Sequence, residues 1–257
     1  MVRQIISSVR VVTSVFGNPD MRRLQLGWGA MSFALWSFAI SLGVYAFGVG
    51  GATAVGIAAL VRLLPGALAS PFAGLLGDRH PRRTVLLLSS LGVTAVLAGS
   101  ALGVALGAPP ALVFGLAGLF TVLSSPYVPA EGALLPAVAR TPQELAAANV
   151  AHSAVDNAGF LAGAVLTGLL LATTGPEVAF AAAAAASAAA ATLLAGLRRD
   201  TRPSYVRGAD ASGVLQETGR GARILLADTR LRLIATALTL LVFFEGAADV
   251  LVVIVAL

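Results

Sequence analysis

Four charged residues lie within long apolar stretches of this chain: Arg62, Asp156, Glu245 and Asp249, with Asn157 directly after the second. A charge inside a bilayer costs about 3 kcal/mol on insertion scales, so such residues usually face one another or a water-filled path. Glu245 and Asp249 are four residues apart, which places both carboxylates on one helix face. The five residues are therefore candidates for a central path for a solute and protons. The alternative is structural, with Arg62 in one buried ion pair and the carboxylates stabilising helix packing.

A further ionisable side chain, His152, precedes Asp156 by four residues and shares its helical face. It could join a proton relay, since histidine changes charge between about pH 5 and 8, or be a hydrogen-bonded packing residue. The sequence has no cysteine, no lysine and two histidines. A thiol nucleophile, a phosphate-binding loop and a histidine metal site therefore lack their residues. We expect no enzyme activity, no metal and no cofactor.

The composition places these residues in a membrane. Hydrophobic residues make up 58% of the 257 residues and charged residues 11%, against about 25% charged in soluble domains. Too little polar sequence remains to coat a soluble core, so the expected surroundings are a lipid bilayer. The net charge of +5 does not indicate a nucleic-acid partner, because the basic residues collect in the links between apolar stretches.

Apolar stretches long enough to span a bilayer as helices follow one another along the chain. We place seven of them, near residues 24–48, 53–76, 84–106, 111–130, 147–172, 178–197 and 233–257. The links at 48–52, 107–110 and 173–176 contain the glycines and prolines expected at helix ends, and no arginine. The sequence therefore predicts an all-α integral membrane protein.

The arginines set the expected orientation. All 17 basic residues are arginines, and all except Arg62 fall within residues 1–23, 79–83, 140 and 198–232. These segments share one side of the predicted topology, which the positive-inside rule identifies as the cytoplasm. The richness in Arg, Ala and Gly is typical of a bacterial gene. We expect a multi-pass protein of the inner (plasma) membrane with a cytoplasmic amino terminus.

The predicted organisation has four parts: a cytoplasmic tail at 1–23, a six-helix bundle at 24–197, a cytoplasmic linker at 198–232 and a further helix at 233–257. The apolar stripe from Ile5 to Phe16 could lie in the membrane interface or belong to a loosely ordered tail. Within the linker, Val214 to Leu226 could form a short surface helix or remain without one.

Small residues and prolines mark where the predicted helices touch and bend. Alanines fill most of 181–191 in the sixth helix, and glycines recur in the third and fifth helices: Gly99, Gly103, Gly107, Gly159 and Gly163. Small side chains let membrane helices approach closely, so we interpret these residues as helix contacts and not as ligand sites. Pro126 and Pro129 are expected to bend the inner end of the fourth helix, with Glu131 at its mouth.

The link between the second and third helices carries the most specific motif. It contains six residues of a known pattern: Gly74, Gly77, Asp78, Arg79, Arg82 and Arg83. The segment resembles the loop signature of the major facilitator superfamily, although Pro81 replaces its usual second glycine. The resemblance implies a six-helix half-bundle and a cytoplasmic gate, in which exchangeable charge contacts hold one face of the transporter closed. A plain topology signal is the alternative, since any short cytoplasmic loop tends to be basic.

Two further segments resemble the drug-efflux-like branch of this superfamily. These are Ala133–Pro136 after the fourth helix and Glu144–Asn149 leading into the fifth. A Gly-Pro pair associated with antiporters is often present in the fifth helix of that branch, but here Gly163 is followed by Ala164, which weakens the antiport inference. The resemblance implies a secondary active transporter that works as an efflux carrier by alternating access. The carboxylates within the spans suit proton coupling, and a cavity that is apolar with a few charges suits small lipophilic or amphipathic solutes better than sugars.

The number of predicted helices indicates how much of a transporter this sequence supplies. Members of the superfamily usually have two six-helix halves with the solute site between them, whereas residues 24–257 supply one half, a linker and a seventh helix. We therefore expect a truncated carrier that lacks its C-terminal half. The alternative is a non-transporting membrane protein that acts as an assembly partner or is an inactive fragment. An open reading frame beyond codon 257 would separate the two.

Overall fold

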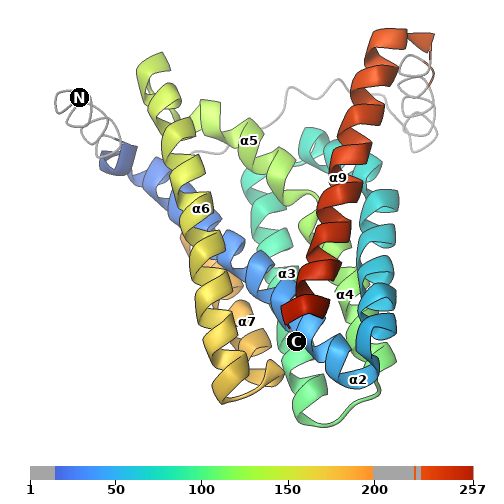
Figure 1. The fold of residues 1–257 in the computed structure, drawn as a ribbon. Coiled ribbons are helices and arrows are strands. Elements are labelled where there is room, and N and C mark those ends of the chain that lie inside the picture. Colours follow the sequence, from blue (N-terminus) through green and yellow to red (C-terminus); the bar gives the residue numbers. More distant parts are fainter. Residues whose placement is uncertain (1–14, 199–222, 224–226, 257) are drawn as a thin grey trace, which may run out of the picture.

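The computed structural model describes residues 15–198, 223 and 227–256, and every regular element among them is a helix (Figure 1). The helices are α2 (Pro19–Arg79), α3 (Arg82–Ala105), α4 (Pro110–Ser124), α5 (Tyr127–Val138), α6 (Pro142–Thr173), α7 (Pro176–Ala195) and α9 (Thr229–Ala256). This confirms the expected all-α architecture. The expected interfacial stripe before residue 15 and the expected surface helix at 214–226, apart from Arg223, lie outside the described residues.

Helix α2 contains the first two expected spans, which are joined at a sharp kink. The helix is interrupted at Gly50, with φ −161° and ψ 27°, and at Gly51, with φ 60° and ψ −152°. The second of these conformations is open essentially only to glycine. The chain therefore folds back on itself at the predicted link 48–52, and the two arms of α2 diverge from this point (Figure 1).

The fourth expected span is broken into α4 and α5. Pro126 lacks a backbone N–H and cannot continue the hydrogen bonds of α4, so α4 ends at Ser124 and α5 begins at Tyr127. The break confirms the expected bend. The predicted end at residue 130 is wrong, however, because α5 continues to Val138 and the apolar segment as a whole runs from Pro110 to Val138. Glu131 consequently lies inside a helix and is buried, not placed at a mouth.

Helix α6 begins at Pro142, five residues before its predicted start, because its first turn is capped. The Thr141 side chain accepts a hydrogen bond from the backbone N–H of Glu144 at 3.1 Å. The Glu144 carboxylate in turn accepts one from the backbone N–H of Arg140 at 2.7 Å. Such reciprocal capping satisfies donors that have no partner within the helix.

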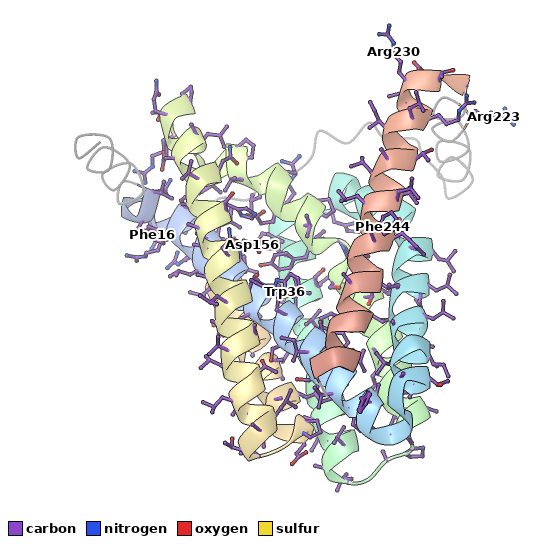
Figure 2. The ribbon with its side chains drawn as sticks, viewed as in Figure 1. Phe16, Trp36, Asp156, Arg223, Arg230 and Phe244 are labelled. Carbon is purple, nitrogen blue, oxygen red and sulfur yellow. The ribbon has the colours of Figure 1, made fainter. Side chains whose placement is uncertain are left out.

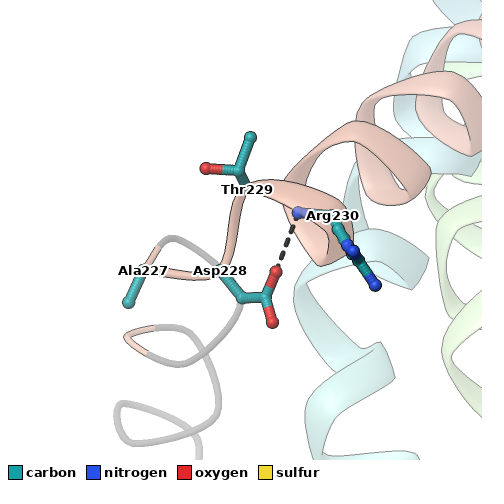
Figure 3. Close-up of a pocket in the computed structure, with 4 residues that line it drawn as sticks. All are labelled: Ala227, Asp228, Thr229 and Arg230. Carbon is teal, nitrogen blue, oxygen red and sulfur yellow. Dashed lines mark hydrogen bonds between the residues drawn. The ribbon is translucent and has the colours of Figure 1, made fainter.

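Helix α9 also starts earlier than residue 233. Asp228 caps it by accepting a hydrogen bond from the backbone N–H of Arg230 at 2.8 Å (Figure 3). It also accepts one from the backbone N–H of Leu231 at 3.4 Å. A surface hollow beside this cap is lined by Ala227, Asp228, Thr229 and Arg230. Its polar groups are those of the cap itself, so the hollow is part of the helix start.

Apolar side chains cover the outside of the bundle. Five segments among the described residues are long and apolar enough to cross a membrane, and one of them, Pro19–Ser70, contains the break at Gly50 and Gly51. Leu68, Leu102 and Leu161 are each more than 60% exposed. An apolar surface of this extent is unfavourable in water and suits contact with lipid tails.

Small residues bring the helices together, as expected for most of the positions. Alanines of α7 such as Ala183 and Ala190 are fully buried, and α7 packs against α2 and α3. A Cβ on Gly159 would lie 2.8 Å from the Cβ of Ser32, and one on Gly163 would lie 3.0 Å from the Cβ of Trp36. These two glycines of α6 are therefore sites of close helix approach.

Among the glycines of the third span, Gly99 and Gly103 lie at ordinary helix contacts with α4, and Gly107 differs from the prediction. A Cβ on Gly99 or Gly103 would meet its nearest neighbours at ordinary distances of 3.5 Å and 3.7 Å. Gly107 has φ +66°, and a Cβ added at this position would have no heavy atom within 4 Å. It serves the turn after α3, where a positive φ is needed, and is not a helix contact.

Candidate functional site

The glycine- and arginine-rich motif lies where α2 ends and α3 begins. Gly74, Gly77, Asp78 and Arg79 occupy the last turns of α2, and the placement of their side chains lies outside the described structure. Pro81 is the N-cap of α3, with φ −53° and ψ 125°. This extended conformation turns the chain between the two helices, so Pro81 fits the short link in place of the family's usual glycine.

The two arginines that open α3 bind the backbone of other helices. Arg82 Nη1 donates to the carbonyl of Ala133 in α5 at 2.7 Å. Arg83 Nη2 donates to the carbonyl of Ala195 at the end of α7. Ala195 is the last residue of α7, where carbonyls have no partner within the helix, and the Arg83 guanidinium supplies a charged donor for it. The link between α2 and α3 is thereby fastened to α5 and α7.

The start of α2 is fastened to the same end of α7. Arg23 donates to the carbonyl of Gly196, and Asp20 accepts a hydrogen bond from the backbone N–H of Arg198 at 3.1 Å. Asp20 also lies 3.8 Å from Arg23. Charged groups of three segments thus join the helix ends at this side of the bundle, which we call the arginine-rich end.

Asp156 lies between α6 and α2, away from the ends of the bundle (Figure 2). Its Oδ1 accepts a hydrogen bond from Ser32 Oγ at 2.9 Å. Asn157 is exposed, and its Nδ2 donates to the Ser153 carbonyl of its own helix at 2.7 Å. The two adjacent polar residues therefore point in different directions, and of the pair only Asp156 contacts a neighbouring helix.

Arg62 and Asp156 contact different residues of α2. Its guanidinium carbon is 5.8 Å from the centre of the Phe38 ring, which is a cation–π distance. Phe38 follows Ser32, the partner of Asp156, by six residues, or about 9 Å along the helix axis. The two charges are thus held by separate parts of the first arm of α2.

The two acidic residues expected to complete the path, Glu245 and Asp249, lie on α9. Helix α9 packs against α2, and the side chains of both residues lie outside the described structure. Their approach to Arg62 and Asp156 stays a prediction.

A cluster that the sequence pattern did not reveal lies between α2, α5 and α6. Glu131 is 3% exposed, and its Oε1 is 3.3 Å from Nδ1 of His152. The imidazole stacks on Trp28, with ring centres 4.9 Å apart and an interplanar angle of 21°. Tyr127 packs on the same indole at 5.8 Å. His152 therefore faces a carboxylate of another helix as well as lying one turn from Asp156.

A cavity of about 220 Å³ adjoins this cluster. It lies between both arms of α2 and the break between α4 and α5, and is lined by Trp28, Met31, Leu35, Gly66, Thr121, Ser124, Ser125, Tyr127 and Val128. Trp28 Nε1 and the Tyr127 hydroxyl are buried and have no hydrogen-bond partner. Since buried polar groups are normally paired, the cavity is a place where water or a solute would find donors.

A family model described as Major Facilitator Superfamily matches residues 24–256. No curated protein sequence matches the chain.

Proposed function

Because the chain belongs to the Major Facilitator Superfamily, a family of membrane transporters, we propose that it takes part in proton-coupled efflux of a small lipophilic solute by alternating access. The membrane transporter follows from the family and from the apolar helices. The coupling ion, the direction and the solute are the proposed part. In this proposal the path is lined by Arg62, Asp156, Asn157, Glu245 and Asp249.

The observation that carries the coupling is the setting of Asp156. Among the described residues no basic side chain pairs with it, and its carboxylate is held by the neutral hydroxyl of Ser32 at 2.9 Å. A carboxyl group with a neutral partner can gain or lose a proton without leaving a buried cation unpaired. Intramembrane carboxyl groups of this kind are typical of proton relays in transporters.

The proposed gate is the arginine-rich end. Arg82 and Arg83 connect the α2–α3 link to α5 and α7 through hydrogen bonds to backbone carbonyls. Such bonds can be exchanged for others when helices move, because they need one charged donor and a free carbonyl. We propose that this end faces the cytoplasm of a bacterial plasma membrane, in line with the positive-inside rule.

The proposed solute class follows from the cavity lining. Trp28, Met31, Leu35 and Val128 supply apolar and aromatic walls. The hydroxyls of Thr121, Ser124 and Ser125 also line the cavity, but each already donates to a backbone carbonyl of α4. Apolar pockets with a few placed polar groups select amphipathic ligands over sugars, which need many hydrogen bonds.

The experiment is transport in proteoliposomes that contain the protein expressed from its complete reading frame. Loss of preloaded lipophilic dye is followed with and without an inward proton gradient, alongside a radiolabelled sugar. We expect the gradient to accelerate dye efflux and not to affect the sugar. In Asp156→Asn the acceleration should disappear, while dye exchange without a gradient persists.

Glu177→Gln is the matched control, because it neutralises a carboxylate in the first turn of α7, at the opposite end of that helix from Ala195. It should keep the proton-driven acceleration. Proton-driven efflux that survives in folded Asp156→Asn would refute the coupling role of Asp156, and sugar transport in place of dye transport would refute the solute class.

A further inference from the structure

Two ionisable side chains that the proposed path does not use meet inside the bundle. Glu131 comes from α5 and His152 from α6, and their nearest atoms, Oε1 and Nδ1, are 3.3 Å apart. These atoms are within ion-pair distance but are not aligned as a hydrogen bond. The Glu131 side chain is 4% exposed and the His152 side chain is 28% exposed. The carboxylate is therefore buried and the imidazole is partly exposed.

Because Glu131 is buried, the number of protons on this pair decides whether a net charge is left in the apolar interior. With one proton between them, the pair is either an ion pair or two neutral groups, and both arrangements suit a buried site. Without that proton, a carboxylate is left buried beside a neutral imidazole, which is strongly unfavourable in an apolar interior.

The nearest charged and titratable groups come from α5 and α6 themselves. Tyr127 lies one turn before Glu131 on α5, and Asp156 lies one turn after His152 on α6. Glu144 lies about 12 Å before His152 along α6, and both its carboxylate oxygens already accept hydrogen bonds, from Asn18 and from the backbone of Arg140. None of these groups supplies a cation to the pair.

The other packed helices contribute little charge at this point. Helix α2 presents the uncharged ring of Trp28 to His152. Arg82 of α3 donates to the backbone carbonyl of Ala133, two residues after Glu131. Between Glu177 and Arg198, α7 has no ionisable residue, and α4 has none at all. Among the residues that the structure describes, His152 is thus the side chain placed to neutralise Glu131.

We propose that Glu131 and His152 form a proton-binding site that joins α5 to α6, and that release of its proton admits water between the two helices. The neighbouring cavity supplies the route, since Trp28 and Tyr127 contact both the cluster and the cavity and carry unpaired polar atoms. The site goes beyond the proposed function, because its proton is held apart from Asp156 and its test needs no transport.

The two tryptophans of the chain provide the test and its control. Trp28 stacks on His152, whereas Trp36 packs edge-on against Phe160 at 4.6 Å. A protonated imidazole quenches an adjacent indole more strongly than a neutral one. In Trp36→Phe, which leaves Trp28 alone, the emission should fall as the pH is lowered from about 9 to 5. In Trp28→Phe, which leaves Trp36, the emission should stay constant.

Two variants in the Trp36→Phe background assign the transition. His152→Gln should abolish it. Glu131→Gln should move it to lower pH, because the negative charge that favours imidazolium is lost. The protection factors of the α5 amides, which correct for the intrinsic rise of exchange with pH, should fall above the transition in the unaltered chain and not in Glu131→Gln, where no buried charge forms.

A second measurement leaves the pair intact, in case its variants fail to fold. The chain has two histidines, so His80→Gln leaves a single ring signal, from His152, for nuclear magnetic resonance. That signal should titrate between about pH 5 and 9. A His152 signal that does not titrate in this range, or a Trp28 transition that survives His152→Gln, overturns the site. Unchanged protection factors of the α5 amides across the transition overturn the proposed entry of water.

Discussion

Replacing Gly159 by alanine tests the packing that positions Asp156. A Cβ at this position would lie 2.8 Å from the Cβ of Ser32, 2.9 Å from its Oγ and 3.0 Å from the carbonyl oxygen of Gly29. Carbon atoms pack best at about 3.5–4.0 Å, so α2 and α6 must separate by up to about 1 Å. The displaced atoms include the Ser32 hydroxyl that binds Asp156.

The expected loss can be estimated from these contacts. Overpacking of this kind costs about 1–3 kcal/mol. A weakened Ser32 to Asp156 hydrogen bond adds about 0.6 kcal/mol, the typical value between membrane helices. Alanine recovers about 0.5–1 kcal/mol through its better helix propensity. We therefore expect Gly159→Ala to lower the free energy of unfolding by about 1–3 kcal/mol.

Gly168→Ala is the matched control, because it lies on the same helix and a Cβ there meets no heavy atom within 4 Å. It should leave the stability unchanged or raise it by up to about 1 kcal/mol. Unfolding by dodecyl sulfate in mixed micelles is followed by tryptophan fluorescence, since Trp28 and Trp36 both contact residues of α6. Equal unfolding free energies for the two variants would refute the close approach of α2 and α6.

Three further substitutions can be measured in the same assay. Gly51→Ala should cost about 1–3 kcal/mol because φ 60° with ψ −152° is strained for alanine; Gly56→Ala, which has open space, should not, and equal effects would argue against the strained turn. Thr141→Ala should cost about 1 kcal/mol through loss of the α6 cap, and Thr141→Ser should restore it if capping is the cause. Ser187→Ala should cost about 0.6 kcal/mol, because it removes the bond to the Ser90 carbonyl; no change would mean that the bond contributes nothing.

Local features of the sequence predicted most of the helices and their breaks. The turn at Gly51 and the break at Pro126 depend on the backbone limits of single residues, which act wherever those residues stand. The ends were less accurate, because a cap such as Thr141 with Glu144 extends a helix beyond its apolar run. The predicted fourth span also ended too early, at residue 130, whereas α5 continues to Val138.

The candidate site was predicted only in part. Asp156 and Arg62 stood out as charges in apolar runs, and both are half-buried in the bundle. Glu131 carries the same signal once the fourth span is continued through its prolines to Val138. Its partnership with His152 has no such signal, because the two residues belong to different helices and share no sequence periodicity.

The sequence by itself determined that the chain is a helical membrane protein of the Major Facilitator Superfamily with charges inside its spans, since hydropathy, motif spacing and glycine or proline geometry act over a few neighbouring residues. Only the tertiary structure decided which of those charges meet. The rotation and depth of each helix are set by side-chain packing between distant segments, as where Gly159 lets α6 approach Ser32 and where Trp28 stacks on His152 beside Glu131. A rotation of α6 by one residue, about 100°, would point His152 away from Glu131 without changing the hydropathy of the chain.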